Sequence, residues 1–224
     1  EVTRMLHGEG GLRTALQVSG DDKSRKAAVD ARLKSAPKGV IPARARLPQK
    51  QQVHLFQAMA EKFSATVVRV KSDKDVPSAV SDYLRSKNLP SRAAIGTDPR
   101  LAAMPWKKEK HLELKSGPSD GSDETGISHA FAAIAETGTL VMTSGADNPT
   151  TLNFLPENHI VIVEASKVTG DLESVMAQIR STFGKGQMPR TVNLITGPSR
   201  SGDIEQKILL GAHGPRALHI VLVE

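Results

Sequence analysis

Short apolar runs rich in β-branched residues alternate with helical patterns along most of the chain, and this alternation limits its fold more than any other feature. The clearest runs are Ala65–Val70, His159–Glu164 and Leu218–Val223. Strands that are apolar at nearly every position are typical of parallel sheets covered on both faces. A helical pattern such as Val76–Arg85 between two runs indicates a βαβ unit. The sequence therefore predicts an α/β fold, a three-layer sandwich with a mostly parallel sheet.

Other segments continue this rhythm. Asp171–Phe183 is predicted to be a helix that Gly184 ends, and Ser72 or Asp73 is the predicted cap of the helix at Val76–Arg85. The helix after Asp171 is expected to turn Leu172, Val175, Met176 and Ile179 inward. Further apolar runs or strands are Arg92–Gly96, Phe131–Ala135, Thr139–Thr143 and Thr191–Thr196, with a weaker one at His111–Leu114.

The first 50 residues differ from the rest in charge. They carry 11 basic and 5 acidic side chains, and residues 1–112 have a net charge of +11 against −5 for residues 113–224. We predict a basic N-terminal arm at residues 1–50, with short helices and an extended segment through Val40–Pro48, before an α/β domain at residues 51–224. Such an arm suits an acidic partner, RNA or a membrane surface, or is simply a solvated basic face. Interleaved aromatic residues and a recognisable nucleic-acid motif are absent, which disfavours nucleic acid.

Composition excludes several classes of protein. The 224 residues include no cysteine, so this chain has no disulfide, no catalytic thiol and no Cys-ligated zinc or iron–sulfur centre. No apolar run approaches the roughly 18 residues of a membrane span, and no signal-peptide pattern is present, although the chain begins at Glu1 rather than Met. We therefore expect a cytoplasmic protein. The seven histidines are scattered, so no metal site is predicted.

The most informative segment reads TGPSRSGDIE and directly follows a predicted strand. We expect it to open a helix, and ligands of open α/β sheets bind beyond the carboxyl ends of strands. Gly197 allows close approach of the backbone, Ser199 can cap a turn or bind an oxyanion, and Arg200 is a forked donor for carboxylate or phosphate. The alternative is a capped helix in which Arg200 pairs with Asp203 or Glu205.

Two other polar segments are candidates for chemistry. Glu136 lies between apolar runs, where a carboxylate is unfavourable unless it is paired or functional, so it is either a base or nucleophile or a structural acceptor of backbone hydrogen bonds. His213, in a glycine-bounded loop, is either an acid/base group or a hydrogen-bonding fixture, and Arg216 is a second candidate anion contact. A long ordered loop is expected to line the cleft with Asn148, Thr150, Asn153, Asn158 and His159.

Four segments together resemble the LUD domain, most nearly its lactate-utilisation protein C branch. They read AETGTLVM, TLNFLPENHIVIV, TGPSRSGDIE and GAHGPRALHIVLVE, and the resemblance covers roughly Val53 to Glu224. It implies a fold similar to the sugar-phosphate isomerase/CoA-transferase type. The motif positions that carry over are Glu136, Thr137, Gly138, Gly197, Ser199, Arg200, Asp203, Glu205, His213, Gly214 and Arg216. Some branches carry a small or acidic residue near Phe131 and a basic one near Asn148, so the ligand stays open.

The resemblance also implies a function. The family is associated with oxidation of L-lactate to pyruvate, together with the iron–sulfur proteins A and B encoded nearby. We therefore predict a lactate-utilisation subunit without a cofactor of its own, which binds a small carboxylate- or phosphate-bearing ligand at Gly197–Arg200. The alternative is a stand-alone transferase, hydrolase or isomerase that acts on a CoA ester or sugar phosphate, with Glu136 as nucleophile or base by analogy with CoA transferases of related fold.

Overall fold

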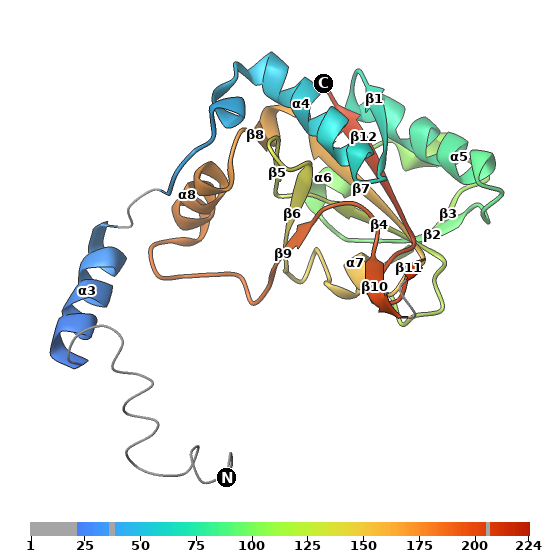
Figure 1. Cartoon of the computed structure of the whole chain (residues 1–224). Coiled ribbons are helices and arrows are strands. Elements are labelled where there is room, and N and C mark those ends of the chain that lie inside the picture. Colours follow the sequence, from blue (N-terminus) through green and yellow to red (C-terminus); the bar gives the residue numbers. More distant parts are fainter. Residues whose placement is uncertain (1–21, 36–38, 205–206) are drawn as a thin grey trace, which may run out of the picture. The chain divides into compact units, whose positions relative to one another are not determined.

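The computed structural model describes residues 22–35, 39–204 and 207–224 (Figure 1). The chain divides into two units between Val40 and Ile41. In the first unit, helix α3 (Asp22–Ser35) buries none of its side chains and carries five Lys or Arg residues against two Asp. One helix is thus present in the predicted basic arm, and the predicted boundary after residue 50 stays a prediction.

Six parallel strands form the central sheet of the second unit, in the order β1-β12-β7-β4-β2-β3. The strands are β1 (Thr66–Val70), β2 (Arg92–Ile95), β3 (Glu113–Ser116), β4 (Thr125–His129), β7 (Asn158–Glu164) and β12 (Ala217–Val223). The predicted α/β class with a mostly parallel sheet is therefore confirmed.

The described helices of this unit include three of ordinary length and two of a single turn. They are α4 (Gln49–Lys62), α5 (Val76–Ser86), α6 (Pro99–Ala102), α7 (Thr151–Phe154) and α8 (Leu172–Phe183), with 3-10 turns η1 (Ala43–Arg46), η2 (Asp73–Asp75), η3 (Trp106–Lys108) and η4 (Ala165–Lys167). Turn η1 interrupts the segment predicted to be extended: Pro42 itself is extended, and its carbonyl accepts from the Ala45 N–H to close the first turn of η1.

The ends of two helices test the capping predictions. Gly184 ends α8 at a φ of 98°, as predicted, and at the other end of this helix the Asp171 carboxylate accepts from the Ser174 N–H at 2.8 Å. The predicted cap of α5 is wrong: Asp75 precedes this helix without a side-chain cap, and the Ser72 hydroxyl donates to the Asp75 carboxylate instead.

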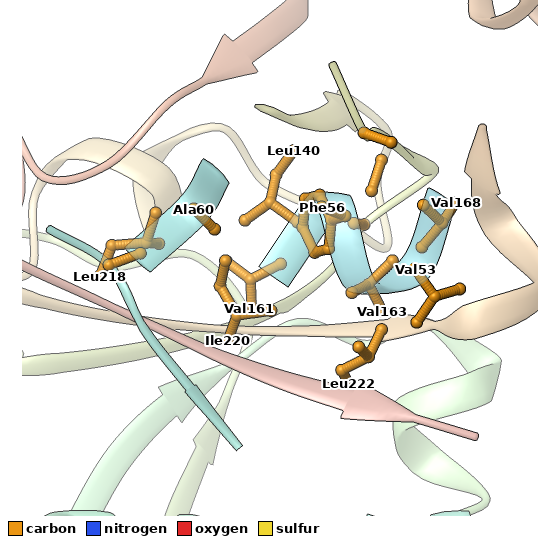
Figure 2. Close-up of a cluster of buried hydrophobic side chains, with 14 of the residues drawn as sticks. Val53, Phe56, Ala60, Leu140, Val161, Val163, Val168, Leu218, Ile220 and Leu222 are labelled. Carbon is orange, nitrogen blue, oxygen red and sulfur yellow. The ribbon is translucent and has the colours of Figure 1, made fainter. Parts of the chain in front are cut away.

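Side chains of the central strands point alternately into two cores. In β7, Val161 and Val163 pack with α4, whereas Ile160 and Ile162 pack with α5. Figure 2 shows the first core, where Phe56 of α4 is fully buried among aliphatic side chains. This two-sided burial is why the strand is apolar at every position, and it places the sheet between two layers.

A smaller sheet completes the layer beside α4, and the sequence did not separate its strands from the main sheet. Its order is β8 (Val168–Thr169), β5 (Ala132–Ile134), β6 (Thr139–Thr143) and β9 (Val192–Ile195). Helix α8 packs on it through Val175 and Ile179. Leu172, predicted to point inward, is 36% exposed, so that expectation was wrong.

The segment predicted to open a helix after Ile195 forms a hairpin instead. Strands β10 (Arg200–Ile204) and β11 (Lys207–Leu210) pair antiparallel, with a register shift between Ser201 and Ile204. Ser, Gly and Asp are common in turns as well as at helix caps, which is why the sequence pattern favoured the wrong element.

Candidate functional site

A pocket of about 290 Å³ lies where the loop after β9 meets the amino ends of β7 and β12. We call it the Arg200 pocket. Five of the predicted site residues line it, namely Gly197, Ser199, Arg200, His213 and Gly214. Because β9 belongs to the small sheet, the carboxyl-end rule for parallel sheets does not apply to this loop, and that part of the sequence argument was wrong.

Backbone hydrogen bonds hold the two glycine-bounded loops of the pocket together. The Ser199 N–H donates to the Pro215 carbonyl at 2.8 Å, and the Gly211 N–H donates to the Ser199 carbonyl at 3.0 Å. The Ser199 hydroxyl accepts from the His213 N–H at 3.2 Å. At Gly197, φ is 69° and a Cβ would lie 2.1 Å from the Phe63 carbonyl oxygen, so only glycine fits there.

Arg200 ties this loop to the end of α4. Its Nη2 donates to the Phe63 carbonyl oxygen at 2.8 Å and to the Ser64 hydroxyl at 2.6 Å, while the side chain stays exposed. Both partners are uncharged. Within the described residues, its Nε and Nη1 groups make no hydrogen bond and no carboxylate forms an ion pair with it. Of the partners predicted for it, the Asp203 side chain and all of Glu205 lie outside the described structure.

The turn at Glu136, Thr137 and Gly138 lies outside the pocket lining but connects to it. Thr137 and Thr139 share a hydrogen bond of 2.7 Å between hydroxyls, and Thr139 shares another of 2.7 Å with Thr196, which lines the pocket. Gly138 has a φ of 67°, and a Cβ there would lie 2.4 Å from the Ala60 nitrogen. The turn therefore packs closely against α4.

Glu136 itself is half-buried beside this turn. Its N–H donates to the Gly170 carbonyl at 3.1 Å, and its carboxylate makes no hydrogen bond or ion pair within the described part of the chain. Arg216 is also outside the lining; its Nη1 lies 3.6 Å from a Glu157 carboxylate oxygen, with the two side chains 64% and 63% exposed. An exposed pair of this kind contributes little to stability.

Asn153 and His159, which were expected to line the cleft, do line this pocket, and the buried Ser128 lies within hydrogen-bond distance of both. His159 Nε2 lies 2.9 Å from the Ser128 hydroxyl, which lies 3.3 Å from Asn153 Oδ1. His159 is 1% exposed, and burial lowers its pKa to about 3. Asn153 lies in α7 and His159 in β7, so the two do not belong to the single long loop that was expected there.

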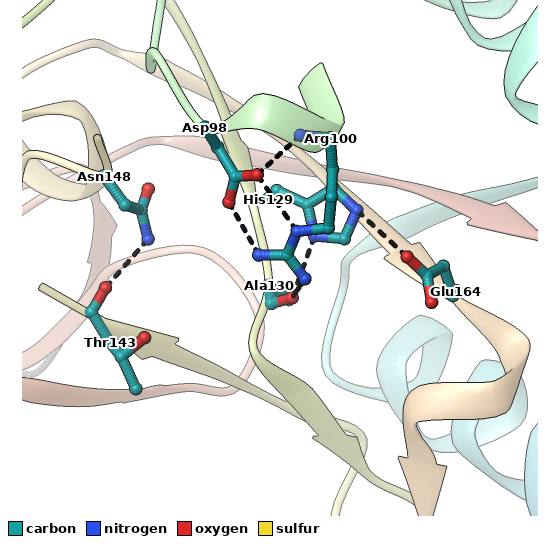
Figure 3. Close-up of polar contacts among 7 residues, drawn as sticks. All are labelled: Asp98, Arg100, His129, Ala130, Thr143, Asn148 and Glu164. Carbon is teal, nitrogen blue, oxygen red and sulfur yellow. Dashed lines mark hydrogen bonds and ion pairs between the residues drawn. The ribbon is translucent and has the colours of Figure 1, made fainter. Parts of the chain in front are cut away.

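A second polar cluster lies at the carboxyl ends of β2, β4 and β7 (Figure 3). Arg100 forms a two-pronged pair with Asp98, through Nε at 3.0 Å and Nη2 at 2.6 Å. Burial alone would raise the pKa of Asp98, but the hydrogen bonds and charge of Arg100 outweigh it and lower the pKa below its usual value. His129 donates from Nδ1 to the Ala130 carbonyl, and its Nε2 lies 3.8 Å from Glu164.

No group of three or more His, Asp or Glu side chains in the described structure is arranged to hold a metal ion. Among the described helices, none has both the length and the apolar character that crossing a bilayer requires.

A family model for the LUD domain matches residues 53–223. A lactate utilization protein C from Geobacillus thermodenitrificans is 38% identical over 109 residues, which are 47% of this chain and 45% of that protein. The protein of the same name from Exiguobacterium sp. is 36% identical over 186 residues, 78% of this chain and 79% of that protein. The matched segment thus spans less than half the length of the first relative.

A solved structure shares the fold. The crystal structure of a DUF162 family protein from Deinococcus radiodurans superposes with a TM-score of 0.58, covering 80% of this chain and 99% of that one at 20% identity. Together with the family match, these likenesses confirm the resemblance found in the four sequence motifs.

Proposed function

Because the chain belongs to the LUD domain family, we propose that it acts in lactate utilisation, as a protein C-type subunit that supports oxidation of L-lactate to pyruvate. The name that its Geobacillus and Exiguobacterium relatives carry supports this role. The partners in this proposal are the iron–sulfur proteins A and B, which would hold the redox centres, since this chain has no cysteine to ligate a cluster.

The ligand in this proposal is a small carboxylate- or phosphate-bearing molecule in the Arg200 pocket. The observation that carries it is that Arg200 has, within the described residues, a carbonyl and a hydroxyl as partners and no carboxylate. The remaining N–H groups of a guanidinium bind carboxylate or phosphate in a forked geometry. By contrast, Arg69, Arg100 and Arg216 each face a carboxylate.

A thermal-shift experiment tests the ligand. The probes are L-lactate, pyruvate, CoA, glucose 6-phosphate and inorganic phosphate. A probe at about a hundred times its dissociation constant adds about 2.7 kcal/mol, and a domain of this size gains roughly 2–4 °C per kcal/mol. We expect a shift in the parent and in Arg216→Ala, and none in Arg200→Ala, each measured against its own ligand-free baseline. A flat panel, or a shift that survives Arg200→Ala, would contradict the proposed pocket.

Reconstitution tests the role in the system. Purified proteins A and B are assayed for lactate-dependent reduction of a dye with and without this chain. We expect the rate to depend on this chain. An equal rate without it would contradict the proposed subunit role, whatever the thermal-shift panel shows.

The alternative is a stand-alone transferase, hydrolase or isomerase with Glu136 as nucleophile or base and His213 as acid or base. What favours it is the half-buried Glu136 carboxylate, which has no described partner. Glu136 does not line the Arg200 pocket, whereas His213 does, so the two groups do not share one described cavity. Turnover of a CoA ester or sugar phosphate by the purified chain, abolished in Glu136→Gln at unchanged stability, would establish it over the subunit role.

A further inference from the structure

Two large apolar side chains of the Arg200 pocket are open to solvent. Phe154 is 42% exposed and Leu194 is 47% exposed, and both line the pocket. We call these two residues the apolar wall. Leu218 also lines the pocket and is buried in the core that contains Phe56. Ligand pockets are typically lined by apolar side chains with a few polar groups that orient the bound molecule, and this pocket has both kinds of lining.

The apolar wall lies next to the polar loops of the pocket. A Cβ on Gly214 would lie 3.6 Å from Cδ1 of Phe154 and 3.6 Å from Cβ of Ser199, so the Phe154 ring is close to the residue that precedes Arg200. Leu194 belongs to β9, which leads into the same loop. Side chains from α7 and β9 therefore place an apolar surface beside the guanidinium loop.

The volume of the pocket exceeds what a three-carbon acid needs. The 290 Å³ correspond to about ten water molecules at roughly 30 Å³ each. Lactate and pyruvate have about six non-hydrogen atoms, and bonded atoms take up less space than separate water molecules. Such an acid held by Arg200 leaves a large part of the pocket unfilled.

We infer that the ligand of the Arg200 pocket is an amphipathic acid, in which a carboxylate or phosphate is joined to an apolar chain or ring of about four or more carbons. The inference rests on the proposed function for the anionic end, which Arg200 binds. The apolar wall is the second contact: it covers the carbon part of the ligand and favours longer acids over three-carbon acids.

Charge and exposure together select this class of ligand. A plain anion such as inorganic phosphate pairs with Arg200 but leaves Phe154 and Leu194 in water. An uncharged apolar molecule covers the wall but leaves Arg200 without a carboxylate or phosphate partner within the described residues. An amphipathic acid does both, and it gains free energy in proportion to the apolar area removed from water.

The test measures how affinity changes with chain length. Dissociation constants are determined by calorimetry on the full chain for propionate, pentanoate and heptanoate, and for ethyl, butyl and hexyl phosphate. In at least one of the two series we expect binding to tighten roughly two- to fourfold per methylene, and thus at least about tenfold from the shortest to the longest acid.

Three variants assign the contacts. In Phe154→Ala, the ratio of affinities between the longest and the shortest acid should fall at least about threefold, because the ring no longer covers the chain. Leu155→Ala is the matched control: Leu155 follows Phe154 and is 48% exposed, but it is not among the described residues that line the pocket, so the ratio should stay that of the parent. Arg200→Ala should weaken all members of a series by a similar factor.

The other outcomes separate this inference from the proposed function. Equal binding along both series in the parent overturns the inference and leaves the proposed anion site standing. A ratio that Phe154→Ala leaves unchanged places the apolar contact elsewhere, which also overturns the inference. If no acid of either series binds, both the inference and the proposed ligand fail. If Phe154→Ala does not fold, Leu194→Ala provides the same comparison from a different element.

Discussion

Buried histidines should make the folded chain lose stability in mild acid. Burial lowers the pKa of His159 to about 3 and, with the nearby Lys87, that of His219 to about 4, from a usual value of 6.5. In the unfolded chain both rings take up protons near pH 6.5, whereas in the folded chain they stay neutral until about pH 3–4. The unfolded state therefore binds more protons below pH 6.5, and the free energy of unfolding falls as the pH falls.

The size of the effect follows from these pKa values. Between pH 7 and pH 5, each of the two histidines lowers the free energy of unfolding by about 2 kcal/mol. Together they remove about 4 kcal/mol, a large share of the usual 5–15 kcal/mol. His129 acts in the same direction, because burial and Arg100 lower its pKa. The lowered pKa of Asp98 stabilises the folded chain above pH 3.8, so its contribution is lost only below this window.

Urea unfolding at pH 7 and pH 5 measures the effect. The parent should lose about 4 kcal/mol or more, and His219→Phe should lose about 2 kcal/mol less than the parent over the same interval. His111→Gln removes an exposed ring and serves as the control, with the loss expected for the parent. If His219→Phe loses as much stability as the parent, the argument from burial is refuted.

Other substitutions test the packing around the pocket and the core. Gly197→Ala should lower the thermal midpoint by more than Gly186→Ala, because both have positive φ but only the first forces a Cβ against a backbone oxygen; equal midpoints would refute the clash. Thr139→Val should cost about 1–3 kcal/mol in urea unfolding by leaving two hydroxyls without their described partner, and a neutral result would show that they find others. Phe56→Ala should cost about 3–5 kcal/mol, and Phe183→Ala, at a site 38% exposed, clearly less; comparable losses would contradict the assigned core.

The strands of the central sheet were predictable where each one carries its own signal, a short run that is apolar at nearly every position. HIVIVE in β7 and LHIVLV in β12 are apolar on both faces, and both faces are buried. The division into two sheets was not predictable in the same way. Strands β5 and β6 have the same apolar composition as the central strands, and their partners depend on contacts between segments far apart in the chain.

The sequence identified the two loops that form the pocket but not the contact between them. The loops at Gly197 and His213 were each identified as glycine-bounded and polar, but their joining through Ser199 and Pro215 spans the hairpin β10–β11, which the sequence assigned to a helix. Asn153 and His159 were expected at the cleft, but their contacts with Ser128 were not predictable, because Ser128 belongs to β4 and lies far from both in the sequence.

In open α/β sheets, ligands usually bind beyond the carboxyl ends of the strands. In this chain, the arginines at the two ends of the main sheet favour the opposite end, where the strands begin. At the carboxyl edge, Arg100 is neutralised by Asp98 in a two-pronged pair, so its charge is satisfied inside the protein. At the amino edge, Arg200 has a carbonyl and a hydroxyl as its described partners, which hold the guanidinium in place without neutralising it. A guanidinium that lacks a carboxylate partner is better suited to bind an anion than one that has such a partner. Within the described residues, the charge balance of these two arginines is therefore the reason why we propose the anion site at the Arg200 pocket.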